Sequence, residues 1–172
     1  MFELLGEQGL DWSWIEVFQV DERVAPDGDP DRNLTHLLES LPEQARSAVR
    51  SMQVTEADLD AAAVAYAAAL PEGLDLVHLG IGVDGHTASL LPGDPVLAVD
   101  DRLVAVTGEY QGRRRITLTY PAFAAARQIL WLITGAEKRE ALAKLRAGDE
   151  SIPAGRLEAR DAIVICDRAA AG

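Results

Sequence analysis

The chain has 172 residues, of which 48% are hydrophobic, 26% charged and 5% aromatic, which fits one globular domain over residues 1–172. Lys and Arg number 16 against 28 Asp and Glu, so the formal net charge is −12. This charge disfavours generic binding to nucleic acid or to anionic membranes, because both need a broad positive field. An anionic small molecule is compatible with it only if a few cations line a cleft.

The sequence also predicts the cellular compartment. Cys166 is the single cysteine and has no partner for an internal disulfide. The opening residues lack the basic end and apolar run of a signal peptide. No apolar stretch approaches the roughly 20 residues of a membrane span. We therefore expect a cytoplasmic chain.

The first half of the chain shows the patterns of alternating strands and helices. Alternation of apolar and polar residues marks strands, and Pro and Gly mark their boundaries. Thr55 or Asp58 is the expected N-cap of the longest helix. In chain order we expect a helical opening at 2–5, a strand at 12–20 running into a charged turn at 21–23, a surface loop at 25–32, helices at 33–41 and 55–70, a strand at 74–79, and a short helix after the glycine-rich segment 80–87.

The second half continues this alternation. We expect strands at 102–106 and 116–119 around a hydrophilic turn at 109–115, a helix at 121–127, a strand at 129–134, a helix at 136–147 and a final buried strand at 162–166. Apolar strands separated by helices indicate a doubly wound, mainly parallel sheet covered by helices on both faces. The expected class is α/β, with the site at the C-terminal ends of the strands.

Polar clusters follow three of the expected strands, at 21–23, 80–87 and 135–138. In a parallel sheet the three clusters would meet at one edge. The glycine-rich segment also matches G-x-G-x-x-G, with Asp100 and Asp101 near the distance of a ribose-binding acid, which is typical of dinucleotide sites. Pro92 disfavours this alternative, because it would stop the required helix after little more than one turn.

His86 is the strongest catalytic candidate. A histidine exchanges protons near neutral pH, and a nearby carboxylate such as Asp84 can fix its tautomer. Glycines on either side let a ligand approach the backbone N–H groups. The alternative is that His86 only caps the following short helix. We expect structural roles for His36, on a surface helix, and for His78, inside a strand.

Candidate cations follow two other strands or turns. Lys138 stands where a helix N-terminus and an ammonium group could hold a phosphate, although by itself it is better interpreted as a solvated lysine of a first helical turn. The run 113–115 is first an exposed basic turn, but Arg115 leads directly into a strand. Cys166 is expected to be a small buried residue, and the Cys and His spacing predicts no metal site.

Five motifs in this order resemble the 6-phosphogluconolactonase family. They are Phe18–Arg23, Pro30–Asn33, Asp75–Gly93, Arg115–Thr119 and Thr134–Lys138. The resemblance implies a Rossmann-like, sugar-phosphate isomerase type of fold. It also implies hydrolysis of 6-phospho-D-glucono-1,5-lactone to 6-phosphogluconate in the oxidative pentose phosphate pathway, without a metal or organic cofactor.

The resemblance also implies roles for individual residues. His86 would activate water, supported by Asp84. Arg23 would lie beside the substrate, and Asp21 of the same motif would belong with these three residues to the catalytic set. Arg115 and Lys138 would hold the phosphate. Gly82, Gly85 and Thr87 would complete the substrate contacts around the histidine.

Two departures bear on the activity. Glucosamine-6-phosphate deaminase/isomerases of the same superfamily carry an Asn-Glu-Pro after the histidine, whereas segment 87–92 here has no glutamate. Whole members of the lactonase family also begin with a strand and a Ser-Gly-Gly-Ser-Thr-Pro-like loop that this sequence lacks. Three explanations stay open. The sequence is a fragment, it is a relative that is catalytically impaired or only binds sugar phosphates, or a partner chain completes its sheet. An incomplete sheet would favour self-association.

Overall fold

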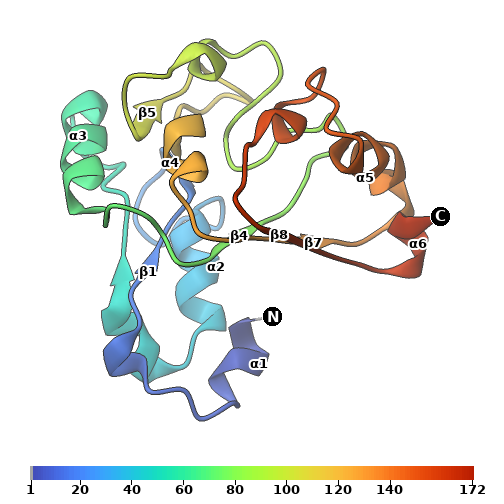
Figure 1. Cartoon of the computed structure of the whole chain (residues 1–172). Coiled ribbons are helices and arrows are strands. Elements are labelled where there is room, and N and C mark those ends of the chain that lie inside the picture. Colours follow the sequence, from blue (N-terminus) through green and yellow to red (C-terminus); the bar gives the residue numbers. More distant parts are fainter. Residues whose placement is uncertain (1) are drawn as a thin grey trace.

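A computed structural model describes residues 2–172, and it contains three small sheets with helices around them (Figure 1). The α-helices are α1 (Phe2–Gly6), α2 (Asn33–Ser40), α3 (Leu59–Ala69), α4 (Tyr120–Ala124), α5 (Arg139–Arg146) and α6 (Arg168–Ala171). The strands are β1 (Val17–Phe18), β2 (Asp21–Arg23), β3 (Val49–Arg50), β4 (Val77–Leu79), β5 (Val104–Val106), β6 (Arg115–Leu118), β7 (Ile129–Ile133) and β8 (Ala162–Cys166). The predicted α/β class is confirmed.

Strands β4, β7 and β8 form a parallel sheet in that order. Each of these strands contributes alternate side chains to the main core, including the buried Leu79, Trp131 and Ile133. This burial is the reason why the strands are apolar runs in the sequence. Helices α5 and α6 lie beside the C-terminal ends of β7 and β8 (Figure 1). The loops that follow β4 and β7 therefore leave the same edge of the sheet.

The sheet of β2, β6 and β5 is antiparallel, which corrects two expectations. Segment 21–23 is a strand rather than a charged turn, and its polar cluster does not share the edge of the parallel sheet. Glu22 explains the difference, because its side chain is fully buried and hydrogen-bonded. A charged residue can be buried when hydrogen-bond partners surround its charged group, so a charged residue in the sequence does not by itself indicate an exposed position.

The region before β2 also differs from the prediction. Trp12–Trp14 forms a 3₁₀ turn, η1, rather than the first part of a long strand. The Asp11 carboxylate accepts a hydrogen bond from the N–H of Ser13, which favours a turn over extended backbone. Within the strand expected at 12–20, Val17–Phe18 is the part that pairs as a strand, with β3. Helix α3 agrees with the prediction, and Asp58 is its N-cap.

The prediction of a short helix after His86 is wrong. Among the described residues between β4 and Pro95 the chain makes only turns, and a 3₁₀ turn, η3 (Pro95–Ala98), is the first helical element there. Ala88 has a φ of 47° and Thr87 pairs with Leu90, so the backbone reverses where a helix would continue. A G-x-G-x-x-G dinucleotide site needs a helix at this point, so this geometry argues against that alternative.

Strand β8 is less buried than expected. Ile163 is 44% and Ile165 is 52% exposed, because both lie on the outer face of an edge strand. Cys166 is only partly buried, and its sulfur accepts a hydrogen bond from Nη2 of Arg146 at 3.3 Å. Both expectations of full burial are therefore wrong. No helix among residues 2–172 is long and apolar enough to cross a bilayer.

Candidate active site

The loop after β4 is closed by its own hydrogen bonds. The Thr87 hydroxyl donates to the carbonyl oxygen of Gly80 at 2.9 Å, and the Gly82 N–H donates to the His86 carbonyl at 2.8 Å. Gly85 has a φ of 80°, and a Cβ there would collide with Ile152. Thr87 is buried, so its hydroxyl stabilises the loop, and substrate contacts of Thr87, Gly82 and Gly85 stay predictions.

Asp84 and His86 form a close pair on this loop. Oδ1 of Asp84 lies 2.6 Å from Nδ1 of His86 and also accepts the His86 N–H at 3.2 Å. Burial opposes ionisation of Asp84, but its hydrogen bonds with His86 together hold the pKa of the carboxyl below its usual value. An ionised Asp84 places the ring proton on Nδ1 and leaves Nε2 as the acceptor. The His86 side chain is 32% exposed, so a ligand can reach it.

Ser89 ties this loop to the antiparallel sheet. Its hydroxyl donates to Oδ2 of Asp21 at 2.6 Å, and its N–H donates to the Thr117 hydroxyl at 3.2 Å. Asn33 donates to the other oxygen of Asp21 at 3.0 Å. Burial raises the pKa of the Asp21 carboxyl, only partly offset by the Ser89 bond and the Arg115 charge. Asp21 therefore joins the histidine loop to β2 and α2.

Arg23 and Arg115 face each other across β2 and β6. They are direct partners in the antiparallel register, an arrangement that is unfavourable for like charges. Burial, and then the charge of Arg23, lower the pKa of Arg115. Arg23 donates from Nη1 to the Asp31 carbonyl oxygen at 3.0 Å. A bound anion between the two guanidinium groups would relieve their repulsion.

Lys138 lies at the edge of the parallel sheet, in the 3₁₀ turn η4 (Ala136–Lys138) after β7. Gly135 starts this turn with a φ of 99°, and its N–H donates to the Asp167 carboxylate at 3.1 Å. Asp167 also caps α6, so one carboxylate orients both segments. Lys138 and the loop with His86 thus follow neighbouring parallel strands.

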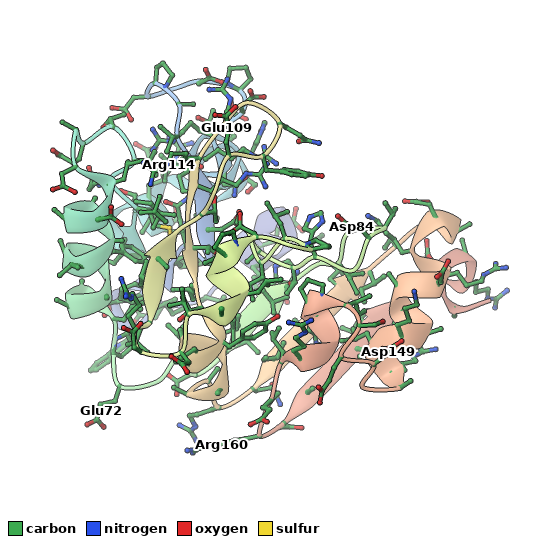
Figure 2. All side chains as sticks on the ribbon, turned by 90° about the horizontal axis from the view of Figure 1, so that it is seen from above. Glu72, Asp84, Glu109, Arg114, Asp149 and Arg160 are labelled. Carbon is green, nitrogen blue, oxygen red and sulfur yellow. The ribbon has the colours of Figure 1, made fainter. Side chains whose placement is uncertain are left out.

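The other predicted polar residues lie as follows. His36 is exposed on α2 with Nε2 at 2.7 Å from the Pro30 carbonyl oxygen, and His78 is half-buried within β4, where burial lowers its pKa. Arg114 is exposed, whereas Arg113 binds Asp31. In the view of Figure 2, Asp84 lies between the hairpin with Glu109 and Arg114 and the helical part near Asp149.

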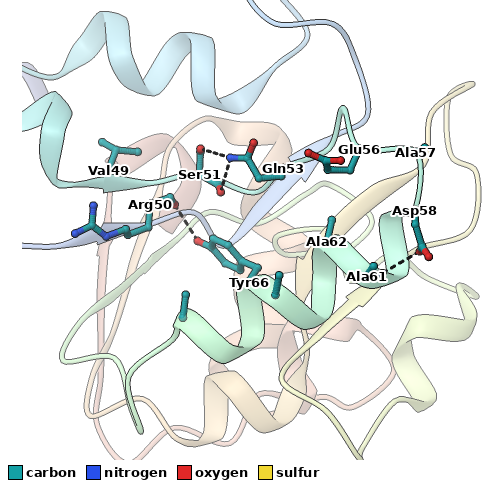
Figure 3. Close-up of a pocket in the computed structure, with 12 residues that line it drawn as sticks. Val49, Arg50, Ser51, Gln53, Glu56, Ala57, Asp58, Ala61, Ala62 and Tyr66 are labelled. Atoms are coloured by element: carbon teal, nitrogen blue, oxygen red, sulfur yellow. Dashed lines mark hydrogen bonds between the residues drawn. The ribbon is translucent and has the colours of Figure 1, made fainter.

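A groove of about 760 Å³ lies elsewhere, between segment 49–58 and α3 (Figure 3). Alanines of α3 and Tyr66 line it, and the Tyr66 hydroxyl donates to backbone oxygens of Gln19 and Arg50. It holds none of the predicted site residues. Within residues 2–172 no group of three or more His, Cys, Asp or Glu side chains is placed to hold a metal ion.

Several residues of this arrangement were not singled out from the sequence. Ser89 and Asn33 lie within the family motifs, and only their bonds to Asp21 give them a role. Tyr110 lies with its ring on the Arg115 guanidinium, which no motif predicts.

The comparisons with known proteins agree with this architecture. Residues 1–165 match the family model described as glucosamine-6-phosphate isomerases/6-phosphogluconolactonase. The chain belongs to this family. Curated relatives named 6-phosphogluconolactonase from Synechocystis sp. and Streptomyces coelicolor are each 36% identical, over 86% and 88% of the chain. In both cases the match spans 66% of the relative's own length.

Solved structures show the same fold. The 6-phosphogluconolactonase of Thermotoga maritima has a TM-score of 0.83 and 27% identity, over 96% of this chain and 78% of the other. A monomeric glucosamine-6-phosphate deaminase has a TM-score of 0.84 at 22% identity, over 99% of this chain and 79% of the other. The second likeness concerns the fold alone.

Proposed function

We propose that this chain hydrolyses 6-phospho-D-glucono-1,5-lactone to 6-phospho-D-gluconate with His86 as the general base. The observation that carries the proposal is the 2.6 Å pair of Asp84 and His86, on a loop bonded through Ser89 to the strand of Arg23. The curated relatives named 6-phosphogluconolactonase support the same activity. The absence of a glutamate in segment 87–92 favours it over deamination.

The chemistry needs a base and positioning rather than a covalent nucleophile, because a lactone is already an activated ester. Nε2 of His86 takes a proton from water as the water oxygen bonds to C1 of the lactone. The bond between C1 and the ring oxygen then breaks, and the protonated His86 returns its proton to that oxygen. The products are a carboxylic acid, which ionises, and a free hydroxyl.

The charges around the loop suit an anionic substrate. Arg115 and Lys138 are the proposed phosphate ligands, and Arg23 stabilises the oxyanion formed at C1. The N–H groups of Gly82 and Gly85 donate within the loop, which favours Arg23 for that role. These cations provide local positive charge in a chain whose net charge is −12.

A coupled assay tests the proposal. Freshly generated lactone is mixed with the chain and 6-phosphogluconate dehydrogenase, and the spontaneous rate of hydrolysis is subtracted. We expect a rate proportional to the concentration of the chain. Binding of 6-phosphogluconate without any acceleration would instead identify a sugar-phosphate-binding relative.

Gly82→Ala is expected to reduce kcat/KM about a hundredfold, because a displacement of about 1 Å at a catalytic group has an effect of this size. A Cβ at Gly82 would collide with Nδ1 of His86 and press on the Asp84 carboxylate. Gly80→Ala is the matched control, since the nearest atom to its Cβ is the Leu132 carbonyl oxygen at 3.9 Å. Equal activity of the two variants would contradict the proposed placement of the pair.

A further inference from the structure

Arg115 is a buried cation that makes no ion pair with a carboxylate of the described residues. Arg115 is 6% exposed, and its Nε is buried and has no hydrogen-bond acceptor in that part of the chain. No ion pair among the described residues includes its guanidinium, whereas nearby Arg113 lies 2.7 Å from Asp31. Buried guanidinium groups are normally paired, so this one has hydrogen-bond capacity left for a ligand.

An aromatic ring holds Arg115 instead. Cζ of Arg115 lies 5.0 Å from the centroid of the Tyr110 ring, which is within the range of a cation–π interaction. The ring attracts the positive charge without accepting hydrogen bonds from the guanidinium. A carboxylate in its place would occupy those donors and neutralise the charge that a phosphate needs.

The hairpin between β5 and β6 fixes the position of the ring. Tyr110 and Arg113 exchange backbone hydrogen bonds of 3.0 and 3.2 Å across a two-residue turn. Gln111 and Gly112 have φ values of 53° and 74°, as a type I′ turn requires. Arg113 in turn binds Asp31 through Nε and Nη2, which anchors the turn to the loop before α2. Figure 2 labels Glu109 and Arg114, the residues that precede and follow this turn in the chain.

We propose that Tyr110 is a positioning residue that holds the Arg115 guanidinium with its ring face, so that the guanidinium donors stay available to the phosphoryl group of the substrate. The inference rests on the proposed function, because it takes Arg115 to be a phosphate ligand. It predicts that Tyr110 affects the binding of phosphorylated ligands and does not affect the reaction at the lactone carbonyl.

Two variants separate the ring from the rest of the side chain. Tyr110→Leu removes the π face, and Tyr110→Phe keeps it. We expect Leu to raise both KM for the phosphorylated lactone and Kd for 6-phosphogluconate about fivefold, with kcat unchanged. Phe should stay within about twofold of the parent chain, since Phe also binds cations. With glucono-1,5-lactone, which carries no phosphate, all three proteins should have equal kcat/KM.

The control is Arg114→Ala, which removes an exposed positive charge adjacent to Arg115 and leaves the ring in place. We expect its Kd for 6-phosphogluconate, measured by calorimetry, to change less than that of Tyr110→Leu. Melting temperatures show that each variant is folded.

Three results would overturn the inference. The first is an unchanged Kd and KM in Tyr110→Leu, and the second is an equal loss on both lactones, which would indicate a structural role. The third is a parent chain that does not bind 6-phosphogluconate. If the parent binds this ligand but does not accelerate lactone hydrolysis, the proposed function fails, and the series of Kd values alone decides the role of Tyr110.

Discussion

His86→Ala is expected to lower kcat for the phosphorylated lactone by about 10²- to 10⁴-fold, the usual contribution of a positioned general base. The variant has no group that takes the proton from water, although the cations still bind the phosphate. Kd for 6-phosphogluconate should therefore change little. The measurement is the coupled assay together with calorimetry, with the spontaneous rate subtracted.

His36→Ala provides the matched control for this prediction. His36 is an exposed histidine of α2 that contacts the Pro30 carbonyl oxygen and lies 3.7 Å from Glu39. Its replacement should leave kcat unchanged. If both variants keep the parent rate, His86 is not the base. If His86→Ala loses binding as well as turnover, the histidine acts on substrate affinity.

The sequence predicted those elements whose signal is local. The apolar run of β7 and the helix α2 correspond to elements of the structure with nearly the expected bounds, whereas β4 covers only the second half of the strand expected at 74–79. The spacing of Asp84 and His86 predicted their contact, because two residues on one tight loop have little freedom to separate. Local patterns suffice when the interaction partners are close in the chain.

The remaining features depend on partners far apart in the sequence. Strand β2 looks like a charged turn until the buried hydrogen bonds of Glu22 are known. The bond from Ser89 to Asp21 spans 68 residues and lies within the backbone reversal that replaces the expected helix. Tyr110 is five residues from Arg115, and only the turn at 110–113 brings its ring onto the guanidinium.

Glu22 supports the second large effect, which concerns stability. Its carboxylate is fully buried and accepts the N–H groups of Arg23 and Asn33 at 2.7 and 2.8 Å, and that of Leu34 at 2.8 Å. Asn33 and Leu34 begin α2, so Glu22 caps a helix whose own N-cap side chain makes no such bond. It also pairs at 3.1 Å with Nε of Arg32, which is 3% exposed.

Glu22→Ala is therefore expected to destabilise the chain by about 3–5 kcal/mol, because it leaves the buried guanidinium of Arg32 without its carboxylate partner and several N–H groups without their acceptor. Asp27 still binds Nη1 of Arg32, but it is exposed and cannot replace the buried oxygen. Urea unfolding measures the change in free energy. Glu22→Gln, which keeps one acceptor oxygen, should lose less.

The matched control is Glu16→Ala, which removes the glutamate of a second, exposed Glu–Arg pair. Glu16 lies 2.7 Å from Arg50, but the two side chains are 57% and 48% exposed, so water solvates either charge when the other is removed. We expect a loss of about 0–1 kcal/mol. Equal losses for Glu16 and Glu22 would show that burial of the Glu22 carboxylate does not control stability. A large loss confined to Glu22 would show that its buried carboxylate, which bonds both the start of α2 and the backbone of Arg23, stabilises the fold through burial.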